Sequence, residues 1–226
     1  MTHVQWTALA LALISGTGAL AGDDGALELS EALVFPRGEA ATSARLDVPL
    51  SQLLPGGRPT APGALALVVH KAKRRLDLLV DGRLVKSYLV NLGFSPLGDK
   101  EQRGDNRTPE GDLFVCAKNP KSQFTRFLAL AYPSPEHVAR AVARHSADRS
   151  LERAVRAAYR RRRSCPPQES ALGGAVGIHG RGGWTRTANG FRVVDWTWGC
   201  LGLRDADILE LFDLVSVGTR VRVLAE

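Results

Sequence analysis

Two short stretches decide the fold and the chemistry of this chain: Gly177-Ile-His179-Gly180 and Asp195-Trp-Thr197-Trp-Gly199-Cys200-Leu-Gly-Leu203. Each places one reactive side chain, His179 or Cys200, at the end of an apolar strand and beside glycine. A thiol near a histidine can lose its proton to the imidazole, and the thiolate is the nucleophile. Glycine lets backbone N–H groups approach a ligand closely, so this turn can present amides to an oxygen. The pattern therefore indicates a Cys–His catalytic site.

Other interpretations of the same two side chains stay open at this point. A single cysteine is more often a small buried apolar residue, and a single histidine is more often structural. A histidine that acts as a base needs its second ring nitrogen held, and the carbonyl of Gly180 is a candidate partner. Zinc coordination by His179 and Cys200 is a weaker alternative, because the chain contains no CxxC or HxxxH pair.

Short β-type runs surround these stretches. Residues 76–80 and 84–91 flank Asp81-Gly82, which predicts a hairpin with a tight turn. A polar loop spans about 95–108, and a helix is expected at 205–214 with Asp205 as its cap. Further strands are predicted at 65–70, 111–116, 173–179, 193–198 and 220–224. The pattern predicts a mainly β domain of about 160 residues with helices on its outside.

One segment carries most of the positive charge. The chain has 226 residues and a formal charge of +7, and the nine arginines and three acids between 136 and 164 supply +6 of it. Ala and Val recur there at three- and four-residue spacing, which predicts an amphipathic helical pair inserted at about 134–170. A solvated helix face is one interpretation. The other is a surface that adsorbs an anionic envelope polymer or lipid. No aromatic residues are interleaved with the arginines, which makes nucleic acid an unlikely partner.

The amino-terminal region indicates export. Residues 6–20 are uncharged and rich in Ala and Leu, and Ala19-Leu-Ala21 has the small-x-small form of a signal-peptidase site. We expect a signal peptide at 1–21 and a linker at 22–63, in which an element near 46–54 docks on the domain. A buried amino-terminal helix is the alternative, because no Lys or Arg precedes Arg37. In an oxidising compartment Cys116 and Cys165 could pair and leave Cys200 free, or they could be unrelated thiols.

The ensemble of motifs resembles a known family. Ile-His179-Gly180, then Thr197-Trp-Gly199-Cys200, then a helix containing Asp207, is similar to the L,D-transpeptidase catalytic domain, also called the YkuD family. Upstream, Asn91-Leu-Gly93 resembles the family's "xxG" strand end and Arg107-Thr-Pro-Glu-Gly111 resembles its "TPxG" turn. The resemblance covers about residues 65–226.

This resemblance implies a mainly β, two-sheet sandwich or barrel-like domain at 64–226 that needs no cofactor and no metal. Cys200 would attack the carbonyl that joins the third residue of a peptidoglycan stem peptide to the following D-alanine. His179 would take the thiol proton, and the Gly180 carbonyl would orient the imidazole. The oxyanion would be held by backbone amides of Cys200, Gly199 and Trp198. Trp184 and Thr197 are candidates for the substrate cleft, and the 95–107 loop and the arginine-rich helices are candidate covers for it.

One departure from the family pattern concerns specificity. Many members carry arginine two residues after the cysteine, whereas this chain has Gly202, and Arg204 cannot be assumed to replace that guanidinium. Three functions are therefore weighed: transfer of the acyl group to an amine, hydrolysis of the same bond by an L,D-carboxypeptidase or amidase, and non-catalytic binding of peptidoglycan.

Overall fold

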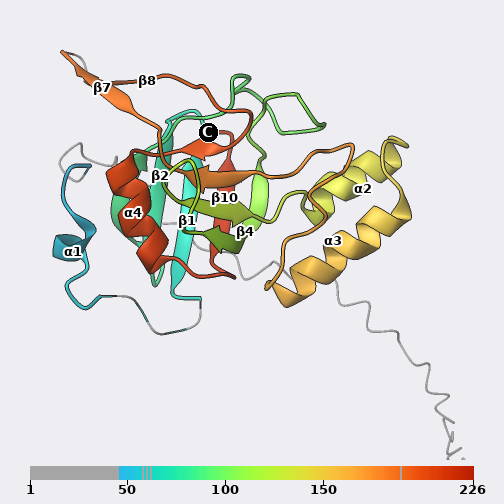
Figure 1. Ribbon diagram of the computed structural model, residues 1–226, viewed down its shortest axis with the longest axis horizontal. Coiled ribbons are helices and arrows are strands. Elements are labelled where there is room, and N and C mark those ends of the chain that lie inside the picture. The colour runs from blue at the N-terminus through green and yellow to red at the C-terminus, as the bar shows by residue number, and fades with distance from the viewer. Residues whose placement is uncertain (1–45, 58, 60, 62, 189) are drawn as a thin grey trace, which may run out of the picture. The chain divides into compact units, whose positions relative to one another are not determined.

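The computed structural model describes residues 46–226 except 58, 60, 62 and 189 (Figure 1). The expected signal peptide at 1–21 and the first part of the expected linker, residues 22–45, lie outside the described residues. Within the described ranges, no helix combines the length and apolar character required to cross a bilayer. The described part of the linker contains the short helix α1 (Leu50–Leu53), whose Leu50 is buried.

Eight strands of the described residues form one curled sheet in the order β3-β2-β1-β10-β4-β5-β6-β9. The mainly β fold class predicted from the sequence is confirmed. The strand bounds are β1 Leu65–His70, β2 Arg75–Val80, β3 Arg83–Leu89, β4 Gly111–Asn119, β5 Phe127–Leu130, β6 Gly177–His179, β9 Leu201–Gly202 and β10 Arg220–Leu224. A second, two-stranded sheet consists of β7 (Trp184–Thr187) and β8 (Gly190–Val193).

The β2–β3 hairpin forms where the sequence predicts it. Asp81 and Gly82 both adopt positive φ, +49° and +73°, which a two-residue hairpin turn requires and which Asp-Gly tolerates well. The first five residues of β1 are buried, so this central strand is covered on both faces. It pairs antiparallel with β2 and parallel with β10.

The two ends of the curled sheet meet at Asn91. This residue follows β3, and it exchanges backbone hydrogen bonds of 2.8 and 2.9 Å with Gly202 in β9. Its side-chain amide donates to the carbonyls of Gly183 and Val194, and its Oδ1 accepts from the Gly183 amide. The contacts of Asn91 thus join the hairpin half of the sheet to the strand that follows Cys200.

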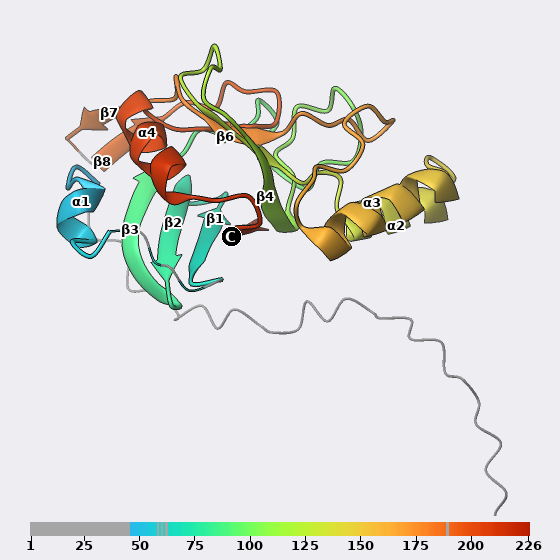
Figure 2. The ribbon, with the colours of Figure 1, turned by 60° about the horizontal axis from the view of Figure 1, so that its bottom comes forward.

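Four helices lie outside the sheet in the described part of the chain (Figures 1 and 2). Helix α4 (Asp205–Leu214) has the predicted bounds and packs against β5 and β6. The predicted cap is wrong: Arg204 occupies the cap position, and the Asp205 carboxylate instead accepts from the Arg181 amide (2.7 Å) and the Thr125 hydroxyl (2.8 Å). The predicted helical insertion forms α2 (Pro135–Ala143) and α3 (Arg149–Arg161), which pack against each other.

Two predicted strands differ from the structure. The expected strand at 173–179 is shortened to β6, since Gly173 and Ala175 have positive φ, +89° and +54°, which interrupts the extended backbone. The expected strand at 193–198 is wrong, because β8 already ends at Val193. Beyond it the carbonyl of Leu92 accepts from the amides of both Trp196 and Thr197, which bends the chain instead of extending it.

A disulfide joins Cys116 in β4 to Cys165, which follows α3, and leaves Cys200 as a free thiol. The bond closes a loop with a sequence separation of 49 residues. The loop-entropy relation gives a stabilisation of about 4 kcal/mol for a loop of this length. We therefore expect the double variant C116S/C165S to lose up to about 4 kcal/mol of unfolding free energy in a urea titration. The same titration of C200S, with and without reductant, is the control; equal stability of oxidised and reduced protein would contradict this expectation.

Candidate active site

The strand register brings His179 and Cys200 to the same face of the sheet. Strands β6 and β9 are parallel, with Ile178 opposite Leu201 and His179 opposite Gly202. Side chains of directly paired residues leave a sheet on the same face, and residues two apart in one strand share a face. Cys200 precedes Gly202 by two residues, so its side chain emerges on the face that carries the His179 imidazole. Two motifs 21 residues apart thus converge on adjacent strands.

The imidazole of His179 is buried and has a defined tautomer. Its Nδ1 lies 2.7 Å from the carbonyl oxygen of Gly180, an oxygen that can only accept, so Nδ1 carries the proton and Nε2 is the free acceptor. The ring lies 4.5 Å from the Phe124 ring and 6.0 Å from the Phe127 ring, and Trp196 contacts it edge-on at 5.7 Å, between centroids. Burial lowers the pKa of His179, and the hydrogen bond to Gly180 opposes this only in part. The imidazole is therefore neutral at pH 7.

Gly180 leaves no space for a side chain. A Cβ at this position would lie 2.4 Å from Asp205 Oδ1 and 2.7 Å from the Phe124 carbonyl oxygen. The Gly180 amide donates to the same Phe124 carbonyl at 2.9 Å. The peptide that holds His179 is therefore fixed between Phe124, in the segment before β5, and Asp205 at the start of α4.

Cys200 is partly exposed, and its thiol lies 3.6 Å from the carbonyl oxygen of Ala175. Burial of the sulfur raises the pKa of Cys200 to about 11, although a hydrogen bond from the Gly177 amide and the positive charge of Lys100 both act to lower it. At neutral pH the resting group is therefore the thiol and not the thiolate. Any nucleophilic reaction of this sulfur needs a base to remove its proton.

The turn before Cys200 is built around Thr197. Its hydroxyl donates to the Cys200 carbonyl at 2.7 Å and accepts from the Gly199 amide at 3.2 Å. Gly199 has φ +121°, and a Cβ there would lie 2.6 Å from the Arg107 carbonyl oxygen, so no other residue fits. The Gly199 amide, one of the three predicted oxyanion donors, thus has a partner within its own turn. That internal hydrogen bond, which depends on the turn's geometry, has no signature in the sequence.

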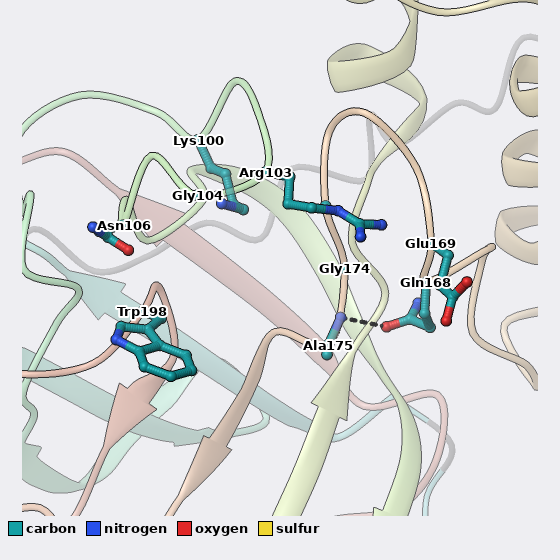
Figure 3. Close-up of a pocket in the computed structure, with 10 residues that line it drawn as sticks. Lys100, Arg103, Gly104, Asn106, Gln168, Glu169, Gly174, Ala175 and Trp198 are labelled. Carbon is teal, nitrogen blue, oxygen red and sulfur yellow. Dashed lines mark hydrogen bonds between the residues drawn. The ribbon is translucent and has the colours of Figure 1, made fainter.

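A cavity of about 380 Å³ is lined by Ala175, whose carbonyl oxygen lies 3.6 Å from the Cys200 sulfur, but not by Cys200 or His179 (Figure 3). The other lining residues from the polar loop and from the segment after α3 are Lys100, Arg103, Gly104, Asn106, Gln168, Glu169, Gly173 and Gly174. Trp198 completes the lining, with 81% of its surface exposed. The loop at 95–107, one of the two expected covers, thus contributes to the wall of this cavity, whereas helices α2 and α3, the other expected cover, contribute no lining residue.

The two other predicted cleft residues lie elsewhere. Thr197 is buried in the turn before Cys200. Trp184 packs against Phe191, with ring centroids 4.6 Å apart, and under the Arg204 guanidinium at 4.5 Å. Neither residue belongs to the lining of the cavity in Figure 3. A role in a cleft remains a prediction for both.

The insertion braces the polar loop that forms the cavity wall. From α2, His137 Nε2 lies 3.0 Å from Asp99, Arg140 forms an ion pair with the same carboxylate, and Arg144 lies 3.1 Å from Glu101. These contacts attach α2 to the loop immediately before Lys100. The buried Lys100 ammonium pairs in turn with Asp105 at 2.6 Å.

Arg204 does not take the place of an arginine at position 202. Its guanidinium binds the Asp207 carboxylate at 2.8 and 3.0 Å and reaches Asp47 at 3.1 Å and the Leu46 carbonyl at 3.2 Å. Asp207, in the first turn of α4, thus holds the Arg204 guanidinium at the start of this helix. Throughout the described part of the chain, no three His, Cys, Asp or Glu side chains gather in a group that could hold a metal ion.

The class that these features define is a curled, mainly β domain with a candidate Cys–His site, in which a free cysteine immediately precedes β9 and a buried histidine ends the neighbouring β6. Within that class the family is shown by sequence: residues 65–223 match the YkuD, or L,D-transpeptidase catalytic domain, family. The chain therefore belongs to this family.

Solved structures similar to this chain include several L,D-transpeptidases. The helical cell shape determining protein Pgp2 of Campylobacter jejuni is 18% identical, with a TM-score of 0.45 over 77% of this chain and 53% of its own. The L,D-transpeptidase of Xylanimonas cellulosilytica is 17% identical, with a TM-score of 0.41 over 78% of this chain and 70% of its own. This chain thus spans about half the length of Pgp2. No curated protein sequence matches it significantly.

Proposed function

We propose that this protein is a cysteine L,D-transpeptidase that acts on peptidoglycan stem peptides. The observation that carries the proposal is the free Cys200 thiol immediately before β9, the strand that pairs with the strand of the neutral, buried His179, within a domain of this family. Family membership supports peptidoglycan chemistry in general. The thioester, its acceptor and the location of the protein are the proposed part.

In the proposed reaction the neutral His179 takes the Cys200 proton on Nε2 while the sulfur attacks the carbonyl that precedes D-alanine. The resulting oxyanion is stabilised by the Cys200 and Trp198 amides, since the Gly199 amide already binds Thr197. When the tetrahedral intermediate collapses, the C–N bond breaks and the imidazolium returns its proton to the departing amine. A thioester remains. An incoming amine then attacks it, loses its proton to His179 and restores the thiol.

The disulfide supports an oxidising location for this chemistry. Structural disulfides persist in the periplasm and outside the cell and are rare in the reducing cytosol. The disulfide joins Cys116 to Cys165 and does not involve Cys200, so the Cys200 thiol stays free to react. We therefore propose that the protein works in the cell envelope.

Whether an amine or water accepts the acyl group from the thioester is tested by incubating the purified protein with tetrapeptide muropeptides and separating the products. We expect cross-linked dimers together with released D-alanine. Tripeptide monomers without dimers would instead assign the hydrolytic function, in which water resolves the same thioester. If neither product forms, and C200A retains the biological effect of the wild type, the protein is a non-catalytic peptidoglycan-binding module and the proposal is wrong.

A further inference from the structure

Helix α3 presents a row of arginines on the side opposite its buried face. The helix buries Val155, Ala158 and Tyr159 against the domain. Four of its exposed arginines follow the spacing i, i+4, i+7 and i+11, which places them in one line along a helix. They are Arg149, Arg153, Arg156 and Arg160, called the arginine row below. At 1.5 Å per residue the row is roughly 16 Å long.

The positive charge of the arginine row is largely uncompensated. Glu152 is the acid that pairs with it, at 3.5 Å from Arg149 and 3.1 Å from Arg156. Within the ranges that the structure covers, Arg153 and Arg160 form no ion pair. The arginines of α2 differ, because Arg140 and Arg144 are paired with acids of the cavity loop, as described above. Of the two helices, α3 therefore carries the excess positive charge.

The arginine row is held rigidly by the domain beneath it. The Tyr159 hydroxyl donates to the Ala131 carbonyl, and its ring contacts Phe114 edge-on with centroids 5.0 Å apart. The disulfide at Cys165 then ties the chain to β4 four residues after α3 ends. A rigid array loses little conformational entropy on binding, so its charges act together. In Figures 1 and 2 the α2–α3 pair lies on the side away from α1 and the β7–β8 hairpin.

We propose that the arginine row binds a linear polyanion that carries phosphate groups along its chain. Guanidinium groups form paired, charge-assisted hydrogen bonds with phosphate oxygens, and successive groups of the row can contact successive phosphates. A membrane surface fits less well, because Ala154 is the one fully exposed apolar residue of α3 and nothing larger is available to enter a bilayer. Nucleic acid fits less well because the row contains no aromatic residue for base stacking.

The test uses the full chain and fluorescently labelled inorganic polyphosphate. For four phosphate contacts the counterion-release relation predicts that affinity falls about 50-fold between 50 and 200 mM salt. We expect the variant R149Q/R153Q/R156Q/R160Q to lose at least about 10-fold in affinity at low salt and most of the salt dependence. The matched control is K73Q/R83Q/K121Q/R192Q, which removes the same charge from exposed residues scattered outside the insertion and is expected to bind like the wild type. Both variants should keep the wild-type melting temperature, because all eight side chains are exposed.

Three results would overturn the proposal. Equal losses in both variants would show that net charge alone drives adsorption. Binding of the wild type that does not change with salt would exclude an electrostatic contact. Tighter binding to phosphatidylglycerol vesicles than to polyphosphate, at equal phosphate concentration, would assign the row to a membrane surface. None of these measurements depends on catalysis, so the proposed transpeptidase function can fail or hold independently.

Discussion

Replacement of Cys200 by alanine is expected to abolish covalent acylation and to lower turnover of tetrapeptide muropeptides by about 10⁴-fold or more. The loss is large because the sulfur forms the thioester bond on which both half-reactions depend. Removing the nucleophile alone lowers the turnover rate about as much as removing the nucleophile and its base together. The measurement is intact mass after brief exposure to a carbapenem, a drug class that the family resemblance implies should acylate the thiol. Wild type should gain one adduct and C200A none.

The fold of C200A is the necessary control. Cys200 is partly exposed, and its sulfur makes only weak polar contacts, to the Ala175 carbonyl and the Gly177 amide. Its replacement should therefore leave the melting temperature within about 2 °C of the wild type. A peptide map of the wild-type adduct must assign the added mass to the peptide that contains Cys200. An adduct on C200A, or undiminished turnover by that variant, would remove the basis of the proposed mechanism.

The parts of the fold that the sequence predicted well depend on local signals. The β2–β3 hairpin is specified by Asp81-Gly82, because two adjacent positive φ angles select such a pair. Helix α4 and β10 were predicted with their observed bounds, since each has its own periodicity over five or more residues. The two-helix insertion was also predicted, because its apolar and arginine residues alternate at helical spacing.

The parts that the sequence did not predict depend on long-range contacts. β7 and β8 are too polar and exposed to show an apolar alternation, and their hairpin was not predicted. The path of 194–198 is set by the Leu92 carbonyl and by Asp195, which accepts from the Leu92 amide and binds Arg74, more than 100 residues away. No spacing rule reveals such pairs.

The candidate site shows the same division. The motifs predicted His179 and Cys200 as the reactive pair, and the parallel register of β6 with β9 is consistent with that pairing, which stays a prediction. They did not predict that Thr197 engages the Gly199 amide, or that the Arg204 guanidinium stacks on Trp184. They also left open whether Cys116 and Cys165 pair, which depends on how the insertion returns to β4.

The pH dependence of acylation is expected to distinguish general-base catalysis from a preformed thiolate. Burial lowers the pKa of His179 below its ordinary value of 6.5, and burial raises the pKa of Cys200 to about 11. The active form has neutral imidazole and protonated thiol. The rate should therefore rise as pH increases through the lowered His179 pKa, become constant before pH 7 and stay constant to about pH 9. A preformed pair of Cys200 thiolate and His179 imidazolium would require the pKa of Cys200 to lie below the pKa of His179.

The variant H179N tests whether the plateau belongs to this imidazole. Without the base, acylation at pH 7 should fall by about 10²–10⁴-fold, and the rate should climb about tenfold per pH unit toward the thiol pKa near 11. The control is H145N, since His145 is exposed and its φ of +56° is a conformation that asparagine also accepts. H145N should keep the wild-type profile. Retention of the wild-type plateau by H179N, or a wild-type inflection above pH 7, would contradict the assigned role, because either result means that a different group removes the Cys200 proton.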